Sequence, residues 1–217
     1  SSRAIIAEKF LAKFAPGPLT VVLPKQNSIS TAVTAGLNTV GIRIPAHPVA
    51  RGLIATAGLP IAAPSANRSG RPSGTTWQTV LEDLDGRIHG ILRGATSDIG
   101  IESTVVDCVS SPPRLLRLGA VTLDDLRSIA PETVQLNFSD SDATINSPGL
   151  RHAHYQPLAK VQLVRDAREL ETIWPEALRR NAEAERQLAS CAYCGLQDTV
   201  LASQLGACEV FSSPIHY

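Results

Sequence analysis

The sequence lacks several features that would assign it to a specialised class. Its 217 residues include no methionine, only 4% are aromatic, and 20 basic residues balance 20 acidic ones, so the formal net charge is zero. A surface dedicated to nucleic acid normally carries a basic excess, so this balance argues against direct nucleic-acid binding. No apolar run approaches the roughly 20 residues that cross a bilayer, and we expect no membrane contact. The first residues have no signal-peptide pattern, and we expect no secretory signal.

Cysteine and histidine are also scarce. The cysteines are Cys108, Cys191, Cys194 and Cys208. Disulfides are unusual without a secretory signal, so we expect a reducing, cytoplasmic location. A structural zinc site needs four ligands, whereas the C-x-x-C pair and Cys208 supply three. His152 and His154 have no carboxylate or thiol at a matching spacing. We therefore predict buried or idle thiols and no metal site.

What is present fits a globular chain with a core. Hydrophobic residues make up 43% of the sequence and charged residues 18%, in the usual range for soluble domains. The sequence opens on SSRAIIAEKF without methionine and stops at SSPIHY without a closing element. We expect a fragment at both ends.

Alternating strand and helix patterns over residues 1–130 predict an α/β fold. The patterns predict helices over 1–14, 47–58, 75–86 and 122–130, and strands over 19–24, 39–45, 59–64, 90–94, 103–109 and 114–119. The last two strands are joined by SSPP and predict a hairpin, hence a mixed sheet. Thr122, followed three residues later by Asp125, predicts a capping box.

The polarity and periodicity of the sequence change near residue 131. Residues 131–159 are polar and poorly periodic, which is typical of a linker. Residues 160–217 begin with the strand-like KVQLV and continue as a helix-forming stretch with a break at Trp174–Pro175. We interpret this part as the start of a second α/β domain.

The stretch APSANRSGRPSGT, residues 63–75, follows an apparent strand and concentrates groups that bind anions. It carries short polar side chains (Ser65, Asn67, Ser73), two glycines (Gly70, Gly74) and two arginines (Arg68, Arg71). Glycines let backbone N–H groups approach an anion closely. Neither G-x-x-x-x-G-K-[ST] nor G-x-G-x-x-G is present. From spacing alone the stretch is either an anion-binding loop or a solvent-exposed turn.

Three other predicted strands each carry a polar residue among apolar ones. Arg43 lies between Ile42 and Ile44, Ser103 precedes TVVD, and Arg117 lies in LLRLGA. A buried charge is costly unless it is paired or faces a cavity, so the three together suggest one cleft lined from several strands. The alternatives are an edge-strand arginine facing water and a simple strand-start serine. The sequence has no G-x-S-x-G elbow and no suitably placed histidine, so it does not indicate a serine hydrolase.

Taken together, PGPLTVVLP, TVGIRIPAHP, LPIAAPSANRSGRPSGT, IESTVVD, LLRLGA and SPGLRHAHYQP resemble the YrdC family, and most closely its long, two-domain form. The resemblance covers roughly residues 1–160. It implies a YrdC-like twisted mixed sheet flanked by helices over 1–130, an active-site lid in the 131–159 linker, and the start of a small Rossmann-like α/β domain over 160–217.

The resemblance also implies a nucleotidyltransferase that makes threonylcarbamoyl-AMP and pyrophosphate from L-threonine, bicarbonate and ATP, with Mg²⁺ accompanying ATP. The product would pass to a separate tRNA threonylcarbamoyl transferase. Carried onto this sequence, the family pattern assigns ATP to Thr39, Ser65, Asn67, Ser73, Arg117 and Ser147, and threonine to Arg43, the Ala63 main chain and Ser103.

One departure from the family pattern matters. The family carries a K-x-R element before the region where this sequence begins, and no K-x-R occurs here. We therefore expect half of a site, inactive by itself. The alternatives are a non-catalytic RNA- or nucleotide-binding module of the same fold, a degenerate regulator, and the carbamoyl-transfer domain of hydrogenase-maturation proteins.

Overall fold

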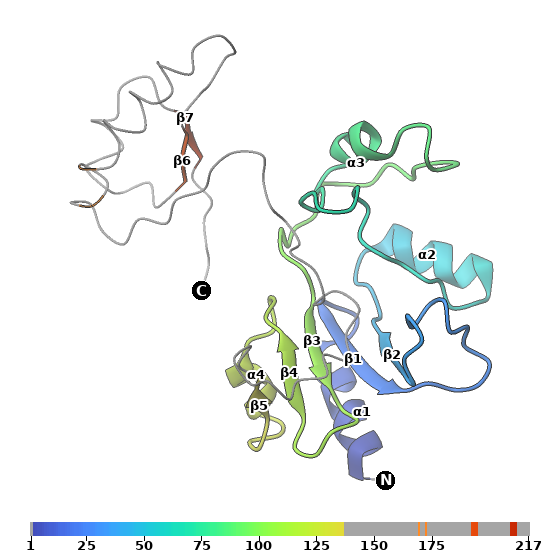
Figure 1. The fold of residues 1–217 in the computed structure, drawn as a ribbon, viewed down its shortest axis with the longest axis vertical. Helices are drawn as coiled ribbons and strands as arrows, with labels where there is room; N and C mark the ends of the chain where they lie inside the picture. Colours follow the sequence, from blue (N-terminus) through green and yellow to red (C-terminus); the bar gives the residue numbers. More distant parts are fainter. Residues whose placement is uncertain (1, 137–168, 170–171, 173–191, 195–208, 212–217) are drawn as a thin grey trace. The chain divides into compact units, whose positions relative to one another are not determined.

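The structure is a computed structural model that describes residues 2–136, 169, 172, 192–194 and 209–211 (Figure 1). The chain divides into two compact units, residues 1–158 and 159–217. In the second unit, β6 (Ala192–Cys194) and β7 (Glu209–Phe211) pair in parallel. The KVQLV strand, the break at Trp174–Pro175, Ser147, His152 and His154 lie outside the described residues, and the predicted domain boundaries remain a prediction.

The first unit is built on a five-stranded mixed sheet in the order β2-β1-β3-β4-β5. The strands are β1 (Leu19–Pro24), β2 (Thr39–Ile42), β3 (Thr104–Asp107), β4 (Arg114–Arg117) and β5 (Val134–Gln135). The β1–β2 and β3–β4 pairs are antiparallel, whereas β1–β3 and β4–β5 are parallel. The predicted mixed α/β sheet and its hairpin are confirmed. β5 lies within the predicted linker, so the sheet continues further than expected.

One face of the sheet carries the main core. Helices α1 (Ser2–Phe14) and α4 (Leu123–Arg127) contribute Phe10 and Leu126, both fully buried, which pack with Leu19 and Val21 of β1 and Val106 of β3. Successive strand residues project to opposite faces. The alternation of β1 therefore directs its other residues to the face that α1 does not cover.

Cys108 is part of the same core and is buried. Burial raises the pKa of its thiol to about 12, with the neighbouring Asp107 charge as a lesser cause. The thiolate is the reactive form of cysteine, so burial makes this thiol unreactive.

The capping box at the start of α4 is confirmed and gives a testable prediction. The Thr122 hydroxyl and main-chain N–H both donate to the Asp125 carboxylate, and these bonds hold the pKa of Asp125 below its ordinary value. We expect Thr122→Ala to cost about 1 kcal/mol of unfolding free energy and to raise the pKa of Asp125 toward that of a free side chain. Denaturant unfolding and NMR titration measure both.

The pH dependence of this contribution has a defined sign. A carboxyl whose pKa is lower in the folded state stabilises the fold above its unfolded pKa of about 3.9, and the contribution is lost as the pH falls through the folded value. The cost of Thr122→Ala should therefore shrink as the pH falls below about 4. A cost that does not change between pH 7 and pH 3 would contradict the role given to the Asp125 bonds.

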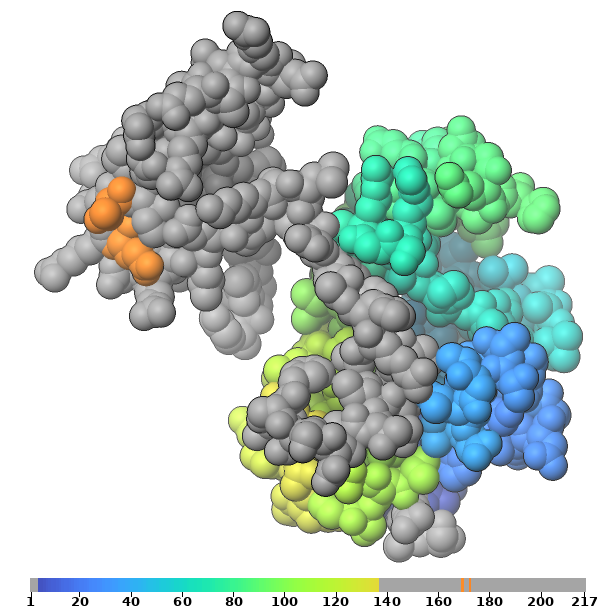
Figure 2. All heavy atoms as spheres, viewed as in Figure 1, coloured from blue at the N-terminus to red at the C-terminus, as the bar shows by residue number. Residues whose placement is uncertain are grey.

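The segment between β2 and β3 contains helices but almost no buried residues, unlike the sheet and its core. It contains α2 (Pro48–Ala57), which starts at the His47 cap and ends at Gly58 with φ 64°, and α3 (Trp77–Leu84), capped by Thr76. Asp83 is the one buried residue between positions 35 and 103. Figure 2 shows the turquoise and green part of this segment as a lobe that projects from the sheet residues.

Two strand predictions in this segment are wrong. Residues 59–64 and 90–94 form no strand, and Leu59 and Leu92 are 69% and 62% exposed. Short apolar runs become strands only where a neighbouring strand accepts their backbone hydrogen bonds, and the described residues offer none. The sequence pattern suggested that the 63–75 loop follows a strand end, and the structure shows that it does not.

Candidate functional site

Several predicted site residues share the sheet face that α1 leaves open. In the β1–β2 ladder, Val22 lies opposite Gly41 and Pro24 opposite Thr39. Directly opposed residues project to the same side of a sheet. The ladder ends at the Val21–Ile42 pair, and Ile44 beyond it accepts a hydrogen bond from the Gly17 N–H, so the register does not continue through Arg43. Because alternate residues of a strand project to the same face, Thr39 lies on the same face as Thr20 and Val22.

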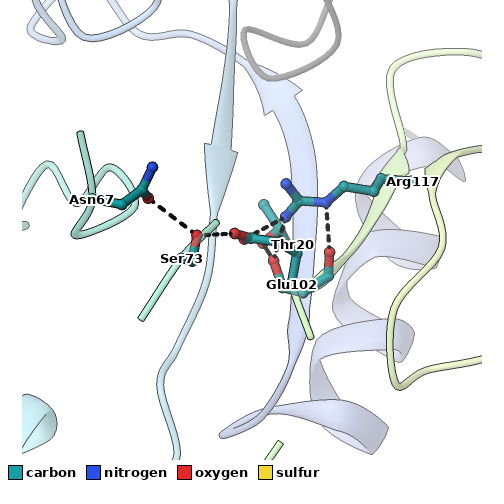
Figure 3. A network of polar contacts seen from close by, with 6 residues as sticks. Thr20, Asn67, Ser73, Glu102 and Arg117 are labelled. Carbon is teal, nitrogen blue, oxygen red and sulfur yellow. Dashed lines mark hydrogen bonds and ion pairs between the residues drawn. The ribbon is translucent and has the colours of Figure 1, made fainter. Parts of the chain in front are cut away.

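A group of hydrogen bonds joins three strands on this face. The Thr20 and Ser103 hydroxyls are 2.8 Å apart, and either can be the donor. Arg117, at the end of β4, donates from Nε to the Ser103 carbonyl at 2.9 Å and from Nη2 to the Ser103 hydroxyl at 3.1 Å. Figure 3 shows the Arg117 side chain reaching toward Thr20 and Glu102. The guanidinium is thereby held in a fixed orientation.

Glu102 links these strands to the 63–75 loop. One carboxylate oxygen lies 3.6 Å from Arg117 Nη2, and the other accepts a hydrogen bond from the Ser73 hydroxyl at 2.8 Å. The Ser73 hydroxyl is also 3.1 Å from Asn67 Oδ1 and, having one proton, donates to one of the two acceptors at a time. Figure 3 shows these contacts in a continuous line. We call the six residues the polar cluster: Thr20, Asn67, Ser73, Glu102, Ser103 and Arg117.

The polar cluster suits a small ligand that carries both hydroxyl and anionic groups. All six residues are half-buried, and the Arg117 and Glu102 side chains are 27% and 31% exposed. They are thus close enough to solvent to meet a ligand. Charge-assisted hydrogen bonds from a guanidinium to an anion are about twice as strong as neutral ones. Arg117 is therefore the group that would contribute most to binding an anion here.

The remaining predicted residues lie outside this cluster of contacts. Thr39 is half-buried, whereas Arg43, Ala63 and Ser65 are exposed. None of the four takes part in the hydrogen bonds of the polar cluster within the described chain. Ser147 is outside the described residues. The structure thus joins Asn67, Ser73, Ser103 and Arg117 through Glu102. The ladder places Thr39 on the same face, whereas Arg43 follows the last paired residue of β2.

Two cluster residues were not assigned to a site from the sequence. Thr20 lies in the apolar run LTVVLP, where a single polar residue facing away from α1 was the available signal. Glu102 stood beside Ser103 in the sequence but had no evident partner. Its partners, Ser73 and Arg117, are 29 and 15 positions away, so only the fold reveals the contacts.

The loop's two arginines are engaged with α3. The Arg68 main-chain N–H and the Arg71 guanidinium both donate to the Asp83 carboxylate, at 2.6 and 2.7 Å. The Arg68 bond, aided by the Arg71 charge, holds the pKa of Asp83 below its ordinary value. Arg71 therefore has its anionic partner within the protein, and its charge is not held ready for a ligand.

Two hollows in the described surface lie apart from the polar cluster. One, of about 470 Å³, is lined by Ile44, Pro45 and residues of α2. The other, of about 240 Å³, includes Trp77 and Arg93, whose guanidinium stacks 4.5 Å from the ring centroid. The cleft that the sequence suggested around residues 43, 103 and 117 is neither of these.

The described residues contain neither a cluster of metal-binding side chains nor a membrane-spanning helix. No group of three or more histidine, cysteine, aspartate or glutamate side chains is arranged to hold a metal ion among the residues described. Within the same residues, no helix is both long and apolar enough to cross a membrane.

A mixed sheet that gathers serine, asparagine and arginine side chains at one face defines an α/β protein with a candidate site for a polar ligand. The profile of the family described as "Telomere recombination", which groups Sua5, YciO and YrdC proteins, matches residues 3–119. The chain belongs to this family.

Curated relatives carry a more specific name. The chain is 47% identical over 159 residues to the threonylcarbamoyl-AMP synthase of Bacillus subtilis, a match covering 72% of this chain and 46% of the relative. It is 42% identical over 166 residues to the Pyrococcus abyssi threonylcarbamoyl-AMP synthase, covering 75% and 48%. The chain thus spans about half the length of the curated relatives it matches.

A solved structure matches as well. The crystal structure of P. abyssi Sua5 complexed with L-threonine superposes with a TM-score of 0.79 at 36% identity, covering 95% of this chain and 59% of that one. The predicted YrdC-like fold, a mixed sheet flanked by helices, is confirmed.

Proposed function

We propose that this chain carries the substrate-binding part of a threonylcarbamoyl-AMP synthase, a nucleotidyltransferase acting on L-threonine, bicarbonate and ATP. The observation that carries the proposal is the polar cluster. It connects Asn67 and Ser73, expected to bind ATP, with Ser103, expected to bind threonine, through Glu102 and Arg117. The identity to named synthases and the likeness to a protein complexed with L-threonine support it.

The proposed reaction has two bond-forming steps. The threonine ammonium loses a proton and its nitrogen attacks the bicarbonate carbon; one C–O bond breaks, and water and a carbamate result. A carbamate oxygen then attacks the α-phosphorus of ATP, and the bond to the β-phosphate oxygen breaks to release pyrophosphate. The protein's task is to hold three small polar reactants together, which in ideal cases contributes roughly 7–11 kcal/mol to lowering the barrier.

The residues have distinct proposed tasks. Arg43 holds the threonine carboxylate, with the Ala63 main chain and the Ser103 hydroxyl beside the amino acid. The nucleotide is contacted by Thr39, Ser65, Asn67, Ser73, Arg117 and Ser147. Fixed hydrogen-bond donors aimed at phosphate oxygens stabilise the charge that develops in the transition state.

Mg²⁺ is proposed to enter with ATP. Magnesium commonly binds through one or two carboxylates together with substrate phosphates. The described residues fit that pattern better than a closed protein cage, because Glu102 is the carboxylate of the polar cluster and no larger acidic group was found among them. When bound, the ion would neutralise phosphate charge.

We propose that the product passes to a separate tRNA threonylcarbamoyl transferase in the cytoplasm. The zero net charge favours this handover over direct contact with tRNA, because nucleic-acid surfaces normally show a basic excess.

The test is pyrophosphate release from ATP that depends on both L-threonine and bicarbonate. Because the chain spans about half of its relatives, the assay compares the chain alone with the chain mixed with the remaining part of the B. subtilis relative. We expect dependent release in the mixture, lost when either threonine or bicarbonate is omitted. Threonine and nucleotide binding without release in any mixture would favour a non-catalytic module instead. Absence of binding would refute the proposal.

A further inference from the structure

Asp83 is unusual among the residues of its segment. It lies on α3, a helix whose other residues are half-buried or exposed, yet only 8% of Asp83 is exposed. Burying a carboxylate is costly unless it is paired and hydrogen-bonded. An acid in the one buried position between residues 35 and 103 therefore requires a partner that offsets this cost.

That partner is the turn of the candidate nucleotide loop. Asp83 Oδ2 accepts the Arg68 main-chain N–H at 2.6 Å and Oδ1 accepts the Arg71 guanidinium at 2.7 Å. Arg68 and Arg71 are the two ends of a turn, in which the Arg71 N–H donates to the Arg68 carbonyl. Asp83 therefore holds both ends of this turn. Gly70, with φ 84°, supplies the left-handed residue within the turn.

The same turn holds Asn67. Its Nδ2 donates to the carbonyls of Arg68 and Arg71 at 2.9 and 2.8 Å. These two bonds fix the direction of the amide, so that Oδ1 faces the Ser73 hydroxyl. The contacts thus run from Asp83 through the turn to Asn67 and on to Ser73.

We propose that Asp83 is a positioning residue for the nucleotide-binding loop. Its contacts from α3 fix residues 67–73, so that Asn67 and Ser73 are already oriented when ATP arrives. We call the contacts of Asp83 with Arg68 and Arg71 the clasp, in which Arg71 binds Asp83 instead of phosphate. The inference rests on the proposed function. Groups oriented before binding lose less conformational freedom on binding, which raises affinity.

The test is the substitution Asp83→Asn, which keeps the size of the side chain but removes its charge and one acceptor oxygen. The dissociation constant of a non-hydrolysable ATP analogue should rise about tenfold, the loss of one hydrogen bond to a charged group. The dissociation constant of L-threonine should change less than about twofold, because one charge-assisted contact outside its site is altered. Calorimetric titration of the full chain measures both constants.

Glu82→Gln is the matched control, since Glu82 is the adjacent, exposed acid on the same helix, and it should leave both constants unchanged. Arg71→Gln removes one arm of the clasp and should weaken nucleotide binding in the same direction but less. It also provides the test if Asp83→Asn does not fold.

The outcomes are separable. Selective weakening of nucleotide binding in both clasp variants supports the positioning role. Unchanged nucleotide binding, or equal weakening of nucleotide and threonine binding, overturns it while leaving the proposed function in place. Absence of nucleotide binding by the unsubstituted chain overturns both.

Discussion

Arg117→Ala is expected to weaken binding of a non-hydrolysable ATP analogue by about 100-fold, equivalent to about 3 kcal/mol of charge-assisted hydrogen bonding. Arg117 is the cation of the polar cluster, and it also orients Ser103 through two hydrogen bonds. Removing it takes away a donor for phosphate and leaves Glu102 as an unbalanced negative charge facing an anionic ligand. Isothermal titration with the full chain measures the change.

β4 supplies the control for this experiment. Arg114 begins the same strand and is exposed, so Arg114→Ala should leave nucleotide affinity within about twofold of the original, as is usual for surface substitutions. Arg117→Lys keeps the charge but loses the planar fork, and we expect it to recover only part of the affinity. Equal affinities for the Arg117→Ala and Arg114→Ala chains would show that the polar cluster does not bind the nucleotide.

Gly119→Ala is expected to destabilise the first unit by about 3 kcal/mol or more, at the upper end of the cost of overpacking. A Cβ at this position would lie closer than van der Waals contact to the Thr104 nitrogen and the Glu102 carbonyl oxygen. These are backbone atoms that cannot rotate away, so β3 and the residues before it must shift. Denaturant unfolding measures the stability loss, and threonine titration should show weaker binding because Ser103 moves with its neighbours.

Gly52→Ala is the matched substitution. Gly52 lies inside α2, and a Cβ there meets nothing within 4 Å. Alanine is a better helix former than glycine by roughly 1 kcal/mol, so this change should leave stability equal or slightly higher. If Gly119→Ala proved as harmless as Gly52→Ala, the close approach of the residue-119 backbone to β3 would be wrong.

The elements that sequence alone predicted well carry their own boundary signals. α2 has a proline at its start and Gly58 at its end, and α4 has the box formed by Thr122 and Asp125. Caps and left-handed ends involve residues a few positions apart, so they can be recognised in a single sequence. The strand predictions at 59–64 and 90–94 failed because a strand also depends on a distant partner, which an apolar run does not specify.

The candidate site also includes residues that the sequence indicated and residues that it did not. Ser103 and Arg117 stood out as polar residues in apolar strands. Asn67 and Ser73 stood out in a stretch that was either an anion-binding loop or an exposed turn, and the resemblance to a family assigned them to ATP. Glu102 could not be assigned, because its partners come from a loop and another strand. Asp83 has no distinguishing sequence feature on an amphipathic helix. Its importance depends on burial against a loop in which its partner, Arg68, lies 15 positions earlier.

The most direct test of the polar cluster as the substrate site is an NMR titration of the full chain with L-threonine and a non-hydrolysable ATP analogue. We predict that threonine shifts the backbone amide signal of Ser103 and that the nucleotide shifts those of Asn67 and Ser73, with Arg117 responding to the nucleotide. Saturable shifts confined to residues outside the cluster, or no shift with either ligand, would contradict the account.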